Sequence, residues 1–194
     1  MKFFTDFLFK KEIGQVIPDL KIHGKPAPYG VINERAIRAT AGIMFTLGLI
    51  TFFIVFSTKN FTLLYPTLAA FWIQFFITVF FGPQYAPFSI IGRWIVSKQQ
   101  PEYVGAIQKR FAWGIGLVMA TTMFLVTAVG GITGMIPMSI CLVCLSFMWL
   151  ESAAGICVGC KIYGWLLSKG YIQTPEHKPA CPGGACSLDF SQKK

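Results

Sequence analysis

Four long apolar stretches divide this chain, and short polar links separate them. The stretches cover about residues 37–56, 61–81, 111–129 and 135–158 of the 194 residues. A bilayer hydrocarbon core about 30 Å thick needs about 20 helical residues to cross it. Isolated strands cannot satisfy their backbone polar groups in lipid. The pattern therefore predicts an all-α integral membrane protein with four transmembrane helices.

Composition and charge support this interpretation. Hydrophobic residues make up 54% of the chain and charged residues 13%, whereas about a quarter of an average soluble domain is charged. The net charge is +9, but every Lys and Arg except Lys59 lies before or at the start of the first stretch, between the second and third, or after the fourth. Because basic residues concentrate in cytoplasmic loops, both termini are predicted to be cytoplasmic. The basic residues are then explained by membrane topology and by contact with anionic lipid, and no nucleic-acid partner is predicted.

The apolar pattern also sets the domain boundaries. Residues 1–30 are predicted to form a cytoplasmic arm, 31–169 a membrane domain and 170–194 a cytoplasmic tail that contains cysteines. In the arm, Phe3, Phe4, Phe7 and Leu8 share one helical face between lysines, which predicts an amphipathic helix lying in the headgroup layer. The segment lacks the small-residue cleavage site of a signal peptide, so we expect it to be retained.

The second half of the chain resembles the first when Arg110 is aligned with Arg38. This repeat alignment also matches Gly42 and Ile43 with Gly114 and Ile115, and Gly92 with Gly164. Each half then contains two stretches, an elbow and a short amphipathic segment, at about 88–96 and 161–167. We expect two similar hairpins, each followed by a short cytoplasmic helix at the membrane surface. The alternative for both short segments is a polar loop.

The pair Cys157 and Cys160 is the strongest chemical signal in the sequence. Its C-x-x-C spacing suits a small-loop disulfide or a soft metal such as zinc, although no cofactor is predicted. If a new helix begins near Cys160, its N-terminus favours a reactive thiolate at Cys157; if the fourth helix continues unbroken, the helix end disfavours it. Packing of small residues is the alternative.

Other candidate residues lie in the tail and in the fourth stretch. His177, Cys181 and Cys186 could exchange disulfides with the elbow or complete a metal site, or they belong to an unstructured tail. Cys141 and Cys144 lie inside the apolar stretch, where packing is the favoured interpretation.

Glu151 is the only acidic residue inside a predicted stretch. An ionisable group in lipid is a candidate functional residue, and here it is grouped with Cys157 and Cys160 as a candidate catalytic residue. The alternative is a structural ion pair with Arg38, Lys109 or Arg110. Because no nucleotide-binding, zinc-protease or serine-nucleophile motif is present, whether the chain is an enzyme stays open.

Four short motifs resemble those of an uncharacterised bacterial membrane family, a domain of unknown function. They are Ile32-Asn33-Glu34-Arg35, the G-P-x-Y-x-P elbow at 82–87, Lys109-Arg110-Phe111-Ala112, and Glu151 followed by Cys157-Val158-Gly159-Cys160 and Tyr163. The resemblance covers about residues 30–165. It implies a multi-pass protein of the bacterial inner membrane, with a thioredoxin-like or rhodanese-like partner.

Three functions are consistent with these residues. The first is thiol-disulfide or sulfur handling, in which Cys157 attacks and Cys160 resolves. The second is transport of a small sulfur-containing or anionic solute, for which four spans would need a homo-oligomer. The third is a scaffold or subunit of a membrane complex.

Overall fold

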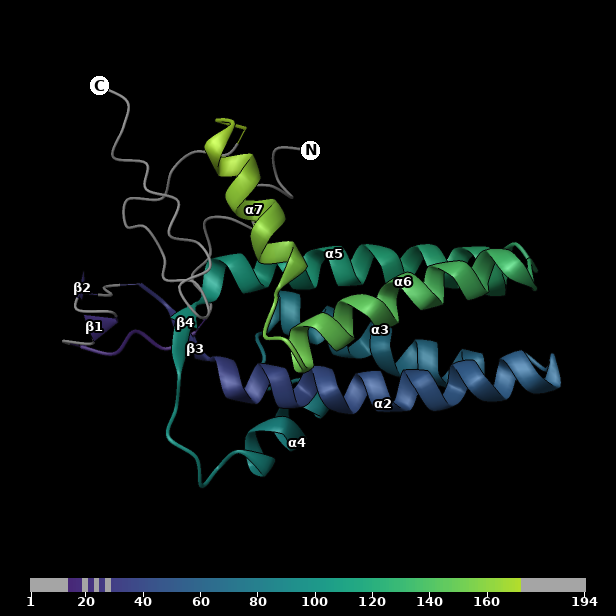
Figure 1. Cartoon of the computed structure of the whole chain (residues 1–194), viewed down its shortest axis with the longest axis horizontal. Coiled ribbons are helices and arrows are strands. Elements are labelled where there is room, and N and C mark those ends of the chain that lie inside the picture. Colours follow the sequence, from purple (N-terminus) through teal and green to yellow (C-terminus); the bar gives the residue numbers. More distant parts are fainter. Residues whose placement is uncertain (1–13, 19–20, 23–24, 27–28, 172–194) are drawn as a thin grey trace.

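The computed structural model describes residues 14–18, 21–22, 25–26 and 29–171 (Figure 1). Within these residues the fold is all-α, with six α-helices, one π-helical segment and four very short strands. The helices are α2 (Glu34–Thr58), α3 (Leu64–Phe80), α4 (Pro87–Ile95), α5 (Ala106–Phe124), the π-helical η1 (Leu125–Val129), α6 (Met135–Ser152) and α7 (Val158–Ser168). The strands are β1 (Lys21–Ile22), β2 (Lys25–Pro26), β3 (Val31–Asn33) and β4 (Tyr103–Gly105). The predicted amphipathic helix around Phe3 and the tail residues His177, Cys181 and Cys186 lie outside the described residues.

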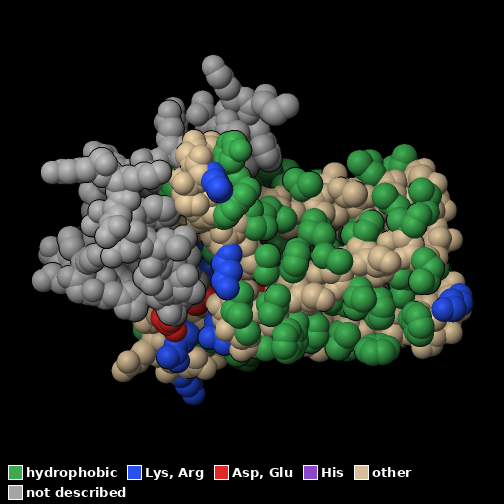
Figure 2. Space-filling view, turned by 45° about the horizontal axis from the view of Figure 1, so that its top comes forward, with side chains coloured by type: hydrophobic (Ala, Val, Ile, Leu, Met, Phe, Trp, Pro, Cys, Tyr) green, Lys and Arg blue, Asp and Glu red, His purple; other side chains and the backbone are tan. Residues whose placement is uncertain are grey.

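Three helices are long and apolar enough to cross a membrane: α2, α5 continued by η1, and α6. The fourth, α3, is apolar but has 17 residues, or about 25 Å at the standard helical rise. Figure 2 shows hydrophobic side chains covering the long shaft of the molecule, with Lys and Arg gathered mainly at one end. These features indicate a multi-pass membrane protein.

Several helix ends differ from the predicted apolar stretches by three to six residues: α2 begins at Glu34, α3 at Leu64 and α5 at Ala106, and α6 ends at Ser152. The first apolar helix begins at Glu34 rather than at 37, because Asn33 caps it through a hydrogen bond from the Arg35 backbone N–H to its side-chain oxygen. The fourth apolar helix ends at Ser152 rather than at about 158. Gly155 then turns the chain with φ +65°, a conformation that glycine adopts at no steric cost.

The described elements fall into two halves that follow the same order. In the repeat alignment, β3, α2, α3 and α4 correspond to β4, α5, α6 and α7. The two strands pair antiparallel, with Val31 opposite Gly105, Ile32 opposite Val104 and Asn33 opposite Tyr103. Because Ile32 and Val104 are themselves equivalent positions, this register is the one that a two-fold axis through that pair would produce.

The helices of the two halves interlock. In the first half, α2 packs mainly against α6 of the second half and against α4, the short helix of the same half. Correspondingly, α5 packs mainly against α3 and against α7. Helices that follow each other along the chain, such as α2 and α3, touch less. The four long helices therefore form one bundle (Figure 1) whose central contacts join the halves.

Candidate functional site

The elbow between α6 and α7 presents the C-x-x-C pair at the start of a new helix. Cys157 is the N-cap of α7, and its sulfur accepts a hydrogen bond from the Cys160 backbone N–H at 3.2 Å. The two cysteines form a disulfide. Their exposed fractions are 5% and 2%. The alternative in which the fourth helix continues through the pair is wrong, and the geometry is the one that favours a thiolate at Cys157 after reduction.

A cluster of three charged side chains joins three helices near this elbow. Lys109 on α5 is 1% exposed, and its Nζ lies 2.8 Å from Oε2 of Glu34 at the start of α2. The same Nζ also pairs with Oε1 of Glu151 near the end of α6. Lys109 is therefore the ion-pair partner of Glu151. The sequence alone offered Arg38, Lys109 and Arg110 as alternatives. We call Glu34, Lys109 and Glu151 the charged triad.

Glu34 was missed as a site residue by sequence reasoning. It precedes the first apolar stretch, so the apolar pattern gives no reason to expect it inside the bundle. It is 1% exposed, because α2 begins at this residue and its first turn packs inside the bundle. The available signal was its spacing, since it lies one helical turn before Arg38 and within the Asn33-Glu34-Arg35 motif.

Two arginines at equivalent positions hold the ends of the long helices. The Arg38 guanidinium donates to the backbone carbonyls of Ser152 and Ala153 at the end of α6, at 3.2–3.4 Å. Its counterpart Arg110 donates through Nε to the carbonyl of Val79 near the end of α3, at 3.1 Å. Each half therefore caps a helix of the other half with a positive group, which satisfies carbonyls that have no helical partner.

The charged triad occurs at only one of the two equivalent places. In the repeat alignment, Ile37 corresponds to Lys109. Ala106 corresponds to Glu34, and Val79 corresponds to Glu151. All three of these counterparts are apolar and buried. The fold thus accommodates apolar side chains at the positions equivalent to the charged triad.

The first elbow likewise holds no cysteine. At the beginning of α4, the Gln74 side chain accepts a hydrogen bond from the Phe88 backbone N–H at 2.9 Å and donates to the Ser89 hydroxyl at 2.8 Å. An amide therefore fixes this elbow, whereas the second elbow is closed by the cysteine pair.

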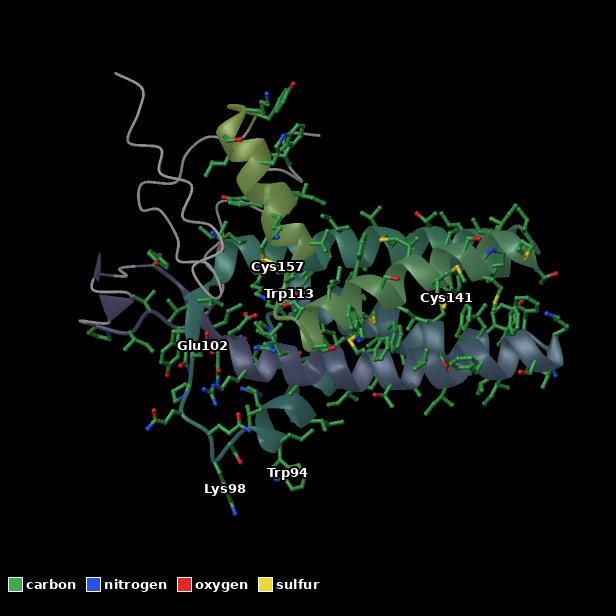
Figure 3. The ribbon with its side chains drawn as sticks, viewed as in Figure 1. Trp94, Lys98, Glu102, Trp113, Cys141 and Cys157 are labelled. Atoms are coloured by element: carbon green, nitrogen blue, oxygen red, sulfur yellow. A yellow bond between two sulfur atoms is a disulfide. The ribbon has the colours of Figure 1, made fainter. Side chains whose placement is uncertain are left out.

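An interior cavity of about 190 Å³ lies between α2, α3, α5, α6 and the start of α7. Its polar end includes Lys109, Glu151 and Cys157, and the rest of its lining is mainly apolar. The thiols Cys141 and Cys144 are free and also line it. Figure 3 shows Cys157 near Trp113 where α7 meets the bundle, and Cys141 further along α6. Cys157 and two ionisable groups, Lys109 and Glu151, therefore border one cavity.

The described residues provide no further metal ligands beside the cysteine pair at the elbow. Among residues 29–171 and the short described segments before them, no group of three or more His, Cys, Asp or Glu could hold a metal ion. A zinc site would have to recruit His177, Cys181 or Cys186, which lie outside those residues.

Comparisons with known proteins place the chain in a family. Searches of curated proteins and of solved structures find no match. Residues 32–168 match a domain of unknown function, DUF4395. This match includes the charged triad and both elbow cysteines, and it extends over most of the chain. The protein therefore belongs to the DUF4395 family.

Proposed function

We propose that this protein is a thiol-disulfide oxidoreductase of the bacterial inner membrane, with four membrane-spanning helices arranged as two hairpins and both termini in the cytoplasm. Cys157 and Cys160 cycle between disulfide and dithiol. The proposal rests on one observation, an asymmetry between two equivalent places in the repeated architecture. In two halves of matching architecture, the cysteine pair and the charged triad occur at only one of the two equivalent places, and Cys157, Lys109 and Glu151 border a common cavity.

The elbow supports particular roles for the two sulfurs. When a partner dithiol reduces the pair, its thiolate bonds to the sulfur of Cys157, and the S–S bond breaks so that Cys160 leaves as a thiolate. The partner's second thiolate then attacks the mixed disulfide and releases Cys157. The partner is thereby oxidised to a disulfide, and the pair becomes a dithiol. The Cys160 N–H that lies 3.2 Å from the Cys157 sulfur stabilises the departing charge.

The charged triad supports a role in moving protons. Two carboxylates around one ammonium carry a formal charge of −1, so the cluster has room for one proton. Glu151 is the member with the more exposed carboxylate, at 16% against 2% for Glu34. Since the reactions of thiols release or take up protons, we assign Glu151 as the group that exchanges them with the cysteines.

The burial of the cysteines bears on the partner. A soluble protein cannot contact sulfurs that are 5% and 2% exposed without some opening of the elbow. We therefore propose that the tail pair Cys181 and Cys186 relays equivalents to a thioredoxin-like or rhodanese-like protein. The same cavity argues against transport of an anionic solute, because Lys109 is already neutralised by two carboxylates.

A redox titration tests the proposal. The purified protein, with Cys181→Ser and Cys186→Ser to isolate the elbow, is equilibrated anaerobically with couples of reduced and oxidised dithiothreitol. Free thiols are then trapped with a maleimide and located by mass spectrometry. We expect Cys157 and Cys160 to titrate together and reversibly as a two-electron couple, while Cys141 and Cys144 stay as thiols throughout. A pair that stays oxidised in the folded protein at every ratio, or that never forms the disulfide, contradicts the function.

A further inference from the structure

The cavity beside Cys157 has the size and lining of a site for a flat, lipid-soluble ring. Its volume is about 190 Å³, and a cavity of about 150 Å³ lined by apolar side chains holds a benzene molecule. Aromatic and thioether side chains supply most of the contacts that such a ring would make. Among them are Phe71, Phe75, Trp113, Met44, Met119 and Met148.

The polar groups of the cavity lie where they could reach ring oxygens. Lys109 and Glu151 border it together with Cys157. An ammonium has three N–H donors, and the Lys109 Nζ lies against two oxygens of Glu34 and one of Glu151, so a ligand carbonyl would share one of these donors with a carboxylate oxygen. A ligand that fits must therefore be apolar over most of its surface and carry hydrogen-bond acceptors at one end.

The sulfur chemistry narrows the ligand further. Cys157 borders the cavity, whereas its partner Cys160 is buried behind it. A molecule in the cavity thus meets the sulfur that the helix N-terminus favours as a thiolate. A dithiol needs an acceptor of two electrons and two protons, and among flat apolar rings with carbonyl oxygens a quinone accepts both.

We infer that the cavity binds a membrane quinone, which oxidises the Cys157–Cys160 dithiol. This inference rests on the proposed thiol-disulfide function and names its second substrate. The triad, the cavity and the cysteine pair are then parts of one site, where the dithiol of the tail and the quinone react with the same two sulfurs in turn.

The electrons and protons balance without another reactant. The Cys157 sulfur bonds to a ring carbon of the quinone, and its thiol proton passes to one quinone oxygen. The Cys160 sulfur then attacks the Cys157 sulfur, the S–S bond forms, and the C–S bond breaks with its electron pair returning to the ring. The Cys160 proton reaches the second oxygen by way of Glu151. The dithiol is oxidised to the disulfide, and the quinone is reduced to the quinol.

A cavity-filling variant and a matched control test the inference. The protein, with Cys181→Ser and Cys186→Ser as in the titration, is reduced with dithiothreitol, desalted anaerobically and mixed with decylubiquinone, whose reduction is followed by ultraviolet absorbance. We expect one quinol per Cys157–Cys160 dithiol and none from protein in the disulfide form. Cys144→Phe fills the cavity, and we expect it to slow the reaction at least about tenfold, because displacing reacting groups by about 1 Å already costs much of the rate. Val143→Phe, on a side chain 45% exposed on the outside of the same helix, should leave the rate unchanged.

The possible outcomes separate the inference from the function on which it rests. If the pair cycles with dithiothreitol but reduces no quinone, or if Cys144→Phe and a second filling variant, Ala120→Leu, react as fast as the wild type, the quinone site is wrong and the function stands. If the pair does not cycle with dithiothreitol at all, both are wrong. Thermal unfolding of each variant shows whether it is folded.

Discussion

The two halves of this protein, residues 31–95 and 103–168, share their architecture and differ in chemistry. Both begin with a three-residue strand, continue through two apolar helices and end in a short helix that packs against the first. Both place an arginine at the same position, Arg38 or Arg110, against carbonyls at the end of a helix in the other half. Features that occur twice are sufficient to explain the fold.

The differences are concentrated at one end of the bundle. The second half contributes Lys109, Glu151 and the cysteine pair, and the first half contributes Glu34. The first half has apolar side chains at the positions equivalent to Lys109 and Glu151 and no thiols at its elbow. Because each unusual residue has an ordinary counterpart in the same chain, every mutation below has a control at the equivalent or a neighbouring place.

The largest effect on stability is expected from Lys109→Met. This change leaves Glu34 and Glu151 buried without their cation, which costs about 3–5 kcal/mol when one partner of a buried pair is lost. The control is Ile37→Met at the equivalent position, where exchanging one apolar side chain for another of similar size costs less than about 1.5 kcal/mol. Unfolding titrations in detergent measure both. Equal losses would mean that the triad is not held as a buried ion cluster.

Replacing the capping arginine of either half should reduce stability by a smaller amount. Arg110→Leu and Arg38→Leu each remove a charged donor from helix-end carbonyls, and a hydrogen bond to a charged group contributes about 1.5–3 kcal/mol. Arg35→Leu is the control, since its pair with Glu102 is exposed and 3.8 Å long and such pairs contribute less than about 1 kcal/mol. The same unfolding titration ranks the three. If Arg35→Leu matches the other two, the capping account fails.

The contact of each short helix, α4 and α7, with the bundle depends on a glycine. A Cβ on Gly159 in α7 would come within 2.6 Å of the Ala112 Cα, and one on Gly92 in α4 within 2.8 Å of the Ala36 carbonyl oxygen. We expect Gly159→Ala and Gly92→Ala each to destabilise by about 1–3 kcal/mol through overpacking. Gly164→Ala, which meets nothing within 4 Å, should be neutral or stabilise by up to about 1 kcal/mol. A stabilising Gly159→Ala would show that α7 is not seated on α5.

The smallest effect concerns a hydrogen bond found in one half. The hydroxyls of Thr51 on α2 and Thr67 on α3 lie 2.9 Å apart, while the equivalent positions hold Met123 and Ser139. Hydrogen bonds between membrane helices contribute about 0.6 kcal/mol on average. A double-mutant cycle with Thr51→Val and Thr67→Val should therefore give a coupling near that value. A coupling above about 1.7 kcal/mol, the largest measured for such bonds, would mean that this contact does more than join two helices.

Much of the fold could be predicted from the apolar pattern because it recurs. The stretches predicted α2, α3, α5 and α6, and the repeat alignment matched α4 with α7. The pairing of β3 with β4 could not be predicted, since Val31–Asn33 and Tyr103–Gly105 are three-residue segments without alternation. Their register depends on contacts between the halves that one stretch of sequence does not encode.

The site was predicted less completely, for a related reason. Cys157, Cys160 and Glu151 were recognisable as residue types out of place in an apolar chain. Glu34 was not, because an acidic residue ahead of an apolar stretch ordinarily stays in water. In the structure, α2 begins at Glu34 and buries it against Lys109. The cavity that Cys157 and Glu151 border depends on packing between the halves.

The most direct test of the account replaces the three residues of the charged triad by the apolar residues at the equivalent positions of the repeat alignment. The triple variant Glu34→Ala, Lys109→Ile and Glu151→Val copies Ala106, Ile37 and Val79. Replacing a buried ion cluster by well-packed apolar residues is often neutral or stabilising by about 1–4 kcal/mol. We expect the variant to unfold at or above the wild-type temperature, but to return its reduced Cys157–Cys160 pair to the disulfide at least about tenfold more slowly in anaerobic membrane vesicles, since a positioned proton-transfer group contributes a factor of about 100 or more. A variant that reoxidises at the wild-type rate, or one that fails to fold, would contradict the claim that the one-sided residues form the site and the shared residues form the fold.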